Sequence, residues 1–198
     1  MKYTPTDVAG VTIVDIEPHR DDRGFFSRSF CADEFVEFGL LPDVVQTSIS
    51  YNYARGTLRG LHRQVPPFAE AKLVRCTRGA IVDVAVDVRP ESPTYRNHVM
   101  VQLSADNRRA LFLPPFVAHG FQTLSDNTEV FYQTSGPYEP GGAQGFRWNE
   151  PEFGIEWPLP ISVISDKDAN WPLLRTVDNL TGARHETSVR VPRGRAAS

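Results

Sequence analysis

The clearest secondary-structure signal in the chain is the stretch of residues 81–88. Valines at positions 82, 84, 86 and 88 fall on one face of an extended chain, and Asp83 and Asp87 fall on the other. A period of two residues is typical of a β-strand. The sequence also contains 16 prolines and 14 glycines, which interrupt helices and favour many short strands. These features together predict a fold built mainly of β-strands.

Other segments repeat this strand-like character at regular intervals. Residues 72–76 are predicted as the preceding strand, and a turn at residues 77–79 would join the two strands in a hairpin. Four more strands are predicted in two pairs, each around a polar turn: residues 99–103 with 110–113, and residues 120–124 with 129–134. One short helix is predicted at residues 33–38, with Asp33 as its cap and Gly39 at its end. This pattern predicts an antiparallel β-sandwich or barrel with a ligand site at its mouth.

The length of the chain fits one domain with an appendage. Residues 1–174 of the 198 contain the strand signals and are predicted to form a single domain. Residues 175–198 are rich in Arg, Ser, Thr and Gly with almost no large apolar side chain, which predicts a flexible tail. A basic arm for nucleic acid is the alternative for this tail. The net charge of −3 gives no global positive field, so nucleic acid is not an expected partner.

The sequence predicts a cytoplasmic protein without a membrane partner. The first ten residues carry charges and lack the apolar core of a signal peptide. No apolar run approaches the roughly 18 residues needed to span a bilayer. The two cysteines, Cys31 and Cys76, form no CxxC pattern, and a disulfide framework is not expected.

A cation and an imidazole lie close together in the segment Arg59-Gly60-Leu61-His62. Imidazole titrates near neutral pH, and a nearby cation can stabilise the anion that forms when a proton leaves. That combination suits proton removal from a carbon beside a carbonyl. A regular strand would place Arg59 and His62 on opposite faces, and only a bulge near Gly60 would bring them together. The spacing alone leaves both arrangements open.

Three more side chains have two interpretations each. His119 follows a Pro-Pro turn and is either a loop histidine bonded to the backbone or a positioned polar group. Tyr132 lies in a predicted strand and is either a core tyrosine or a general acid. Asp168 belongs to the cluster Ser165-Asp166-Lys167-Asp168 and lies either in a solvated turn or beside an imidazole whose tautomer it fixes.

A metal site is a further alternative at the same positions. His62, Glu70 and His119 are potential ligands, since two histidines and a carboxylate bind iron and other divalent ions. Lys72 lies close in sequence and would repel a cation. We therefore expect no metal ion and no other cofactor.

Several separated motifs resemble the dTDP-4-dehydrorhamnose 3,5-epimerase family of the cupin superfamily, over residues 8–174. The motifs are Asp22-Arg23-Gly24-Phe25-Phe26, Leu58-Arg59-Gly60-Leu61-His62, Ala71-Lys72-Leu73-Val74, Asp87-Val88-Arg89, Ser92-Pro93-Thr94-Tyr95, Ala118-His119-Gly120-Phe121 and Ser165-Asp166-Lys167-Asp168. The resemblance implies a mainly β fold, a cupin-type jelly-roll barrel or sandwich with a few short helices. It also implies a homodimer in which strands are exchanged.

The resemblance implies an isomerase that needs no cofactor. In this family a proton is removed from C3 and from C5 of a nucleotide-linked 4-keto-6-deoxyhexose, and a proton returns to the opposite face. The expected substrate is a dTDP-sugar, and the expected pathways are those of rhamnose, other deoxysugars and surface polysaccharides. Four catalytic residues are implied: His62 as the base, Asp168 as the carboxylate that orients it, Lys72 as the cation on the enolate oxygen, and Tyr132 as the acid.

The resemblance also implies a set of substrate-binding residues. His119 and Tyr138 match pocket residues near the sugar. The positions that match contacts to the nucleotide and diphosphate are Arg23, Phe26, Gln46, Arg59 and Lys167, of which Arg23 and Phe26 would serve the neighbouring subunit. A guanidinium suits this work because its fork pairs with phosphate oxygens.

The chain departs from the common family pattern beside this nucleotide site. Arg28 and Ala143 stand where glutamate is common, and Ser48 stands where asparagine is common. Arg63 replaces the common aromatic residue after His62. These changes leave the acid–base set intact and leave the nucleotide base and the exact sugar open.

Three other functions remain compatible with the sequence. The nearest is an epimerase that acts at C3 only or at C5 only on another deoxysugar nucleotide. A metal-dependent cupin oxygenase and a non-catalytic sugar-nucleotide binder belong to different classes. Binding alone does not need a base and an acid, which argues against the last of these.

Overall fold

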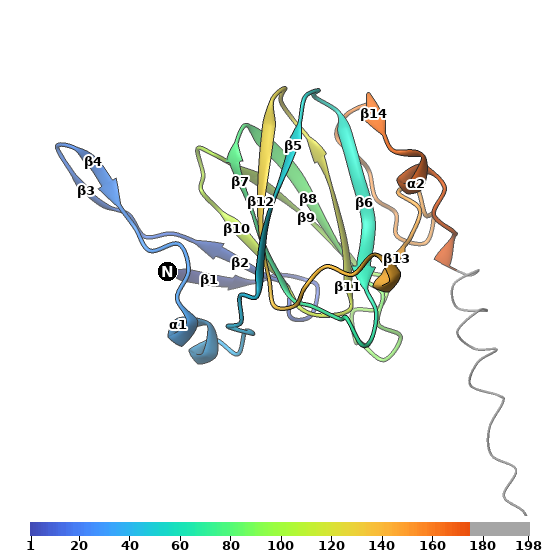
Figure 1. The fold of residues 1–198 in the computed structure, drawn as a ribbon, viewed down its shortest axis with the longest axis horizontal. Coiled ribbons are helices and arrows are strands. Elements are labelled where there is room, and N and C mark those ends of the chain that lie inside the picture. Colours follow the sequence, from blue (N-terminus) through green and yellow to red (C-terminus); the bar gives the residue numbers. More distant parts are fainter. Residues whose placement is uncertain (175–198) are drawn as a thin grey trace, which may run out of the picture.

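A computed structural model describes residues 1–174 of the chain, and the predicted tail at residues 175–198 lies outside the described residues. The body is a sandwich of two β-sheets (Figure 1). In chain order the elements are β1 (Lys2–Pro5), β2 (Thr12–Asp15), β3 (His19–Asp21), β4 (Gly24–Phe26), α1 (Ala32–Glu37), β5 (Gln46–Asn52), β6 (Thr57–Gln64), β7 (Lys72–Arg78), β8 (Ala80–Asp87), β9 (His98–Ser104), β10 (Ala110–Leu113), β11 (Val117–Thr123), β12 (Thr128–Thr134), the 3₁₀ turn η1 (Pro140–Gly142), β13 (Ala143–Gly145), β14 (Val163–Ile164) and α2 (Asp166–Ala169).

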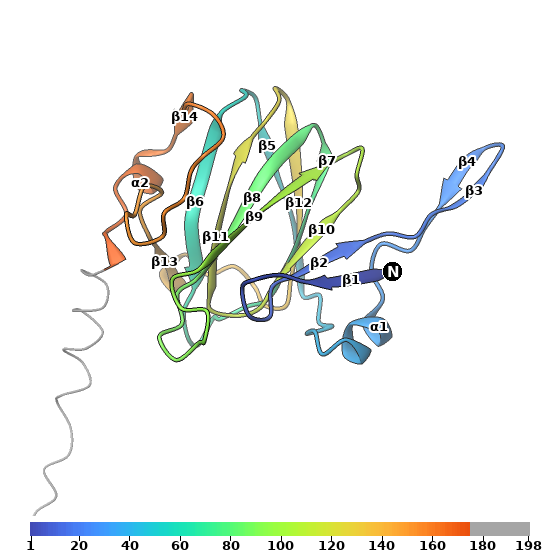
Figure 2. The ribbon, with the colours of Figure 1, turned by 180° about the vertical axis from the view of Figure 1, so that it is seen from behind.

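The two sheets have the order β1-β2-β10-β7-β12-β5 and β13-β6-β11-β8-β9. Strand pairing is antiparallel throughout both sheets, except that β14 joins β6 in parallel. Among residues 1–174, strands β3 and β4 pair only with each other, and they form an arm that projects away from the sandwich in both views (Figures 1 and 2). The mainly β sandwich with few short helices predicted from the sequence is thereby confirmed.

The predicted hairpins are wrong, although their turns are where the sequence places them. β7 and β8 belong to different sheets, and so do β9 and β10, and β11 and β12. Each predicted turn therefore carries the chain from one sheet to the other. Local alternation indicates which side chains share a face, but the neighbour of a strand is decided by contacts that are distant in sequence.

The strand β8 shows how the two faces of the second sheet are used. Its valines face outward, and Val84 and Val86 pack against Leu61, Phe146 and Phe153, which belong to β6 and to the C-terminal segment that covers this sheet. The opposite face lies inside the sandwich, where Ile81 and Ala85 join the main core. Asp83 and Asp87 on that inner face are fully buried. The polar face of this strand is therefore the inner one.

The helix α1 differs from its prediction at its N-terminus. It begins at Ala32 with Cys31 as a cap residue that makes no side-chain cap bond, and Asp33 lies in its first turn. A carboxylate there is still favourable because the helix dipole is positive at this end. Gly39 follows the helix with φ of +72°, as predicted for a helix end. Within residues 1–174 we find no helix with the length and apolar character of a membrane span.

Candidate active site

A bulge in β6 brings Arg59 and His62 to the same cavity. Along β11 His119 and Phe121 are two positions apart, whereas their partners on β6, His62 and Arg59, are three positions apart. Gly60 lies in this bulge with φ of +108°, and a Cβ atom there would lie 2.6 Å from the Cα of Gly120. The bulge that the sequence left as an alternative is therefore the arrangement found.

The cavity lies between the two sheets and has a volume of about 450 Å³. β5, β6, β7, β11 and β12 each contribute side chains to its wall. The lining residues are Gln46, Ser48, Ile49, Ser50, Arg59, His62, Glu70, Lys72, His119, Tyr132, Thr134 and Tyr138. Nine of the residues singled out from the sequence therefore meet in one place: Gln46, Ser48, Arg59, His62, Glu70, Lys72, His119, Tyr132 and Tyr138.

Two titratable rings flank His119 in this cavity. Its ring centroid lies 5.1 Å from that of His62 and 6.1 Å from that of Tyr132. Burial, aided by the charges of His119 and Lys72, lowers the pKa of His62 to about 3, so its imidazole is neutral at pH 7. Burial also raises the pKa of Tyr132 above its usual value. The cavity thus presents a neutral imidazole that can accept a proton and a protonated phenol that can donate one.

Asp83 is a polar residue of this region that sequence reasoning did not place in the site. Its Oδ1 lies 3.2 Å from Nδ1 of His119, and both side chains are almost completely buried. Burial raises the pKa of the Asp83 carboxyl well above its usual value and lowers that of His119 to about 3. Nε2 of His119 is buried without a partner among the described residues. In the sequence Asp83 appeared as a carboxylate between valines. Its contact with His119 depends on the inward orientation of its side chain.

Glu70 is a second residue of the cavity whose role the sequence did not indicate. Its Oε1 pairs with the ammonium of Lys72, and the two side chains are 1% and 10% exposed. Oε2 of Glu70 is buried without a partner in the part of the chain that the structure describes. The pair fixes a positive charge in the cavity wall. Within residues 1–174, no three histidine, cysteine or carboxylate side chains group as metal ligands would.

Asp168 and Lys167 approach the cavity from the C-terminal segment. Both belong to α2, where the Asp168 amide donates to the Ser165 hydroxyl at 3.1 Å. The negative charge of Asp168 acts to raise the pKa of His62, against the larger effect of burial. Its Oδ1 accepts a hydrogen bond from the indole of Trp171 at 3.2 Å. The carboxylate is therefore held near His62 by contacts of its own.

Arg23, Phe26 and Arg28 lie away from this cavity. Arg23 and Phe26 are on the projecting arm, with 90% of the Arg23 side chain and 79% of Phe26 exposed. Arg23 pairs with Asp21 beside it, and Arg28 pairs with Glu34 at 2.5 Å. Within one subunit these three residues do not join the other candidate residues.

Comparison with known proteins identifies the family. The family model described as dTDP-4-dehydrorhamnose 3,5-epimerase matches residues 5–176. A dTDP-4-dehydrorhamnose 3,5-epimerase from Shigella flexneri is 42% identical over 171 residues, which are 86% of this chain and 94% of that protein. A dTDP-4-dehydrorhamnose 3-epimerase from Streptomyces niveus is 35% identical over 175 residues, 88% of this chain and 84% of that one.

A solved structure supports the same assignment. It is the dTDP-6-deoxy-D-glucose-3,5-epimerase from Legionella pneumophila in complex with dTDP-4-keto-L-rhamnose, with a TM-score of 0.84 and 34% identity. The match covers 98% of this chain and 99% of that one. With a family model over most of the chain and relatives above 40% identity, this chain belongs to the dTDP-4-dehydrorhamnose 3,5-epimerase family.

Proposed function

We propose that His62 and Tyr132 carry out the dTDP-4-dehydrorhamnose 3,5-epimerase activity that this chain has as a member of the family. The chain is an isomerase of dTDP-sugars in rhamnose biosynthesis, acting on dTDP-4-dehydro-6-deoxy-D-glucose. One observation carries the assignment of roles. A neutral imidazole on β6 and a protonated phenol on β12 line one cavity from opposite sheets.

Inversion at carbon follows from that placement. A sugar ring held between the sheets exposes one face to His62 and the other to Tyr132. His62 takes the proton from C3 or C5, and the C–H electron pair moves toward C4, so that the carbonyl oxygen becomes an enolate. The ammonium of Lys72 stabilises this oxygen. The Tyr132 hydroxyl then protonates the same carbon from the other face, which inverts it without any change in oxidation state.

Asp168 supports the base in this scheme. Its charge already favours the protonated form of His62, which is the form that exists after proton abstraction. Removing it is expected to leave the neutral imidazole in place and to destabilise the imidazolium. Asp168 therefore acts through His62, without contact to the sugar.

Arg59 is proposed to bind the diphosphate. Its Nε donates to Oδ1 of Asn52 at 2.7 Å, which fixes the guanidinium and leaves its two terminal nitrogens for a ligand. Gln46 accepts a hydrogen bond from the Tyr138 amide at 3.1 Å and donates to Ser48 at 3.2 Å. This network orders the side of the cavity where the nucleotide would enter. Lys167 and His119 complete the proposed contacts.

The arm is proposed to serve a second subunit of a homodimer. A two-stranded ribbon outside both sheets is marginally stable alone, and its exposed Phe26 does not line the active-site cavity of its own subunit. In an arm-exchanged dimer Arg23 and Phe26, together with Arg28 at the base of the arm, would complete the partner's nucleotide site. The cytoplasmic location expected from the sequence stays a prediction.

Mixed dimers test the exchange. An arm variant, R23A/F26A, and a base variant, H62A, are each expected to be nearly inactive alone. When the two are mixed and allowed to exchange subunits, one site per mixed dimer has both an intact His62 and an intact arm from its partner. Recovered activity supports the exchange, whereas activity that stays absent in a population shown to be mixed dimers would contradict it.

Solvent exchange tests the reaction. In D₂O with dTDP-4-keto-6-deoxyglucose, the wild type is expected to place deuterium at C3 and at C5, as read by NMR. His62→Gln should slow both exchanges by about 10² to 10⁴-fold, while His98→Gln on β9, outside the cavity, should leave them unchanged. Exchange at full rate in His62→Gln would overturn the role of the base.

The same spectra distinguish the 3,5-epimerase from an epimerase that acts at C3 only. A relative that is 35% identical is a 3-epimerase, so a C3-only activity is the specific competing function. Deuterium at C3 alone would assign it. A metal-dependent oxygenase and a non-catalytic binder, the other classes considered from the sequence, do not fit membership of this isomerase family.

A further inference from the structure

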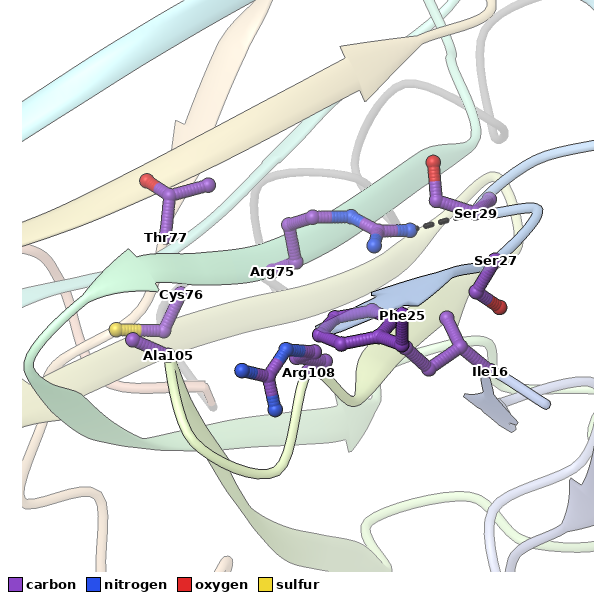
Figure 3. Close-up of a pocket in the computed structure, with 9 residues that line it drawn as sticks. All are labelled: Ile16, Phe25, Ser27, Ser29, Arg75, Cys76, Thr77, Ala105 and Arg108. Carbon is purple, nitrogen blue, oxygen red and sulfur yellow. Dashed lines mark hydrogen bonds between the residues drawn. The ribbon is translucent and has the colours of Figure 1, made fainter. Parts of the chain in front are cut away.

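A second cavity lies at the base of the arm, on the outer face of β7. Its volume is about 280 Å³, and its lining residues are Ile16, Phe25, Ser27, Ser29, Arg75, Cys76, Thr77, Ala105 and Arg108 (Figure 3). Side chains alternate along a strand, so Arg75 points to the opposite side of β7 from Lys72. The sheet therefore separates this cavity from the active site.

Arg75 is a partly buried cation without an ion-pair partner among residues 1–174. Its guanidinium extends toward Ser29 and donates to the Ser29 carbonyl at 2.7 Å (Figure 3). No carboxylate of the described residues forms an ion pair with it. Burial lowers the pKa of this guanidinium. Partial burial of a cation without a counter-charge is unfavourable, so a bound anion here would be stabilising.

A second guanidinium and three hydroxyl groups complete the lining. Arg108 lies 4.6 Å from the ring centroid of Phe25 and donates to the Asp106 carbonyl at 2.7 Å. The hydroxyls are those of Ser27, Ser29 and Thr77, and no lining residue is acidic. The Thr77 hydroxyl already donates to Oε1 of Glu129 at 2.7 Å, and the Ser27 hydroxyl donates to the Arg28 carbonyl at 3.1 Å. The cavity therefore combines two cations with the Ser29 hydroxyl as a neutral donor.

We propose that this cavity binds an oxyanion of the phosphate type between Arg75 and Arg108. Planar guanidinium forks pair with phosphate oxygens in two-point contacts, and the Ser29 hydroxyl adds a neutral donor. The volume holds a phosphate or a diphosphate together with ordered water, since one water occupies about 30 Å³. Phe25 gives the site an apolar wall, which suits the ester side of a phosphate ester.

Binding there would fasten the arm to the sandwich. Phe25, Ser27 and Ser29 belong to the arm and the segment after it, whereas Arg75 and Arg108 belong to β7 and the β9–β10 turn. An anion that contacts both parts would restrict how the arm leaves the body. Any effect on catalysis rests on the proposed function, because the arm is proposed to complete the partner's site.

Calorimetric titration of the full chain tests the site, with inorganic phosphate and inorganic diphosphate as probes and saturating dTDP present to occupy the active site. We expect binding with a dissociation constant in the millimolar range or below. Arg75→Gln and Arg108→Gln should each weaken it about tenfold or more, because each removes a charge-assisted contact. Arg78→Gln, at the end of the same strand and outside the cavity, is the matched control and should bind as the wild type does.

Two outcomes would overturn the proposal: neither probe binds, or binding is lost in Arg59→Gln and retained in both cavity variants. The second outcome would place the anion in the active site. If Arg75→Gln fails to fold, as judged by its thermal melt, the exposed Arg108→Gln decides. Failure of the proposed function would appear separately, as absent deuterium exchange in a protein whose anion titration is unaffected.

Discussion

Replacement of Gly60 by alanine probes the feature on which the active site depends. Gly60 has φ of +108°, a conformation that L residues rarely adopt, and strain of this kind costs about 1–2 kcal/mol. The new Cβ would also lie 2.6 Å from the Cα of Gly120 and 2.7 Å from the carbonyl oxygen of His119. Both are backbone atoms that cannot rotate away, so crowding adds roughly 1–3 kcal/mol. The sum predicts a loss of about 2–5 kcal/mol.

Thermal and urea unfolding measure this loss. For a chain of this size, about 2–4 °C of melting temperature corresponds to 1 kcal/mol, so Gly60→Ala should melt roughly 4–20 °C lower. If the bulge shifts to relieve the clash, Arg59 and His62 no longer share the cavity in the same geometry. A displacement of about 1 Å at a reacting group can cost 10²-fold in rate. The folded fraction of Gly60→Ala is therefore expected to show a reduced kcat/KM as well.

Substitutions at two further glycines separate the effect of backbone strain from that of steric crowding. Gly120→Ala meets the Arg59 carbonyl oxygen at 2.5 Å without a positive φ, so it isolates the steric part. Gly141→Ala meets no heavy atom within 4 Å and should stay within about 0.5 kcal/mol of the wild type. If Gly60→Ala has the same melting temperature as the Gly141→Ala control and keeps full activity, the bulge does not depend on this residue and the reasoning is refuted.

Three other perturbations have definite expected results. The profile of kcat/KM should stay level from pH 8 down to about pH 5, because burial lowers the pKa of His62 to about 3; an acid limb centred near pH 6.5 would show an unperturbed imidazole. Glu70→Gln should lower the free energy of unfolding in urea by about 3 kcal/mol, because it leaves the Lys72 ammonium buried without its counter-charge, and adding Lys72→Met should recover part of the loss. Burial acts to raise the pKa of Asp87, but hydrogen bonds from Arg89 and two hydroxyls lower it to about 2. The ionised carboxylate therefore stabilises the fold above pH 4, and about 1–2 kcal/mol of that stabilisation is lost as the pH falls toward 2. Asp87→Asn should flatten that part of the pH dependence of the melting temperature.

The mainly β architecture is readable from the chain because strand formation depends on local alternation and on turn residues. Residues 81–88 alternate in a two-residue period, and Gly79 adopts φ of +76° where a turn was predicted. The pairing of strands was not readable in the same way. β7 and β8 are neighbours in sequence and lie in different sheets, because antiparallel partners are chosen by side-chain contacts across the whole sandwich.

The candidate site was only partly readable from the chain. Arg59 and His62 drew attention through residue type, but their common orientation depends on the bulge at Gly60 and on its close contact with Gly120. In the sequence Asp83 appeared only as a carboxylate between valines, and Glu70 only as one of three potential metal ligands. Their burial beside His119 and Lys72 appears only after the second sheet closes over the first.

By itself, then, the sequence determined the class of the fold, the candidate acid–base side chains and the family resemblance that named their proposed chemistry. The tertiary structure alone decided that the valine face of β8 turns outward beneath the C-terminal segment and that its aspartate face turns into the sandwich. The physical reason is that alternation along a strand defines an apolar and a polar face but does not decide which face is covered by which other part of the chain. That choice depends on Phe146 and Phe153, more than fifty residues further along the chain, which cover the valines and leave the interior to the polar groups of the candidate active site.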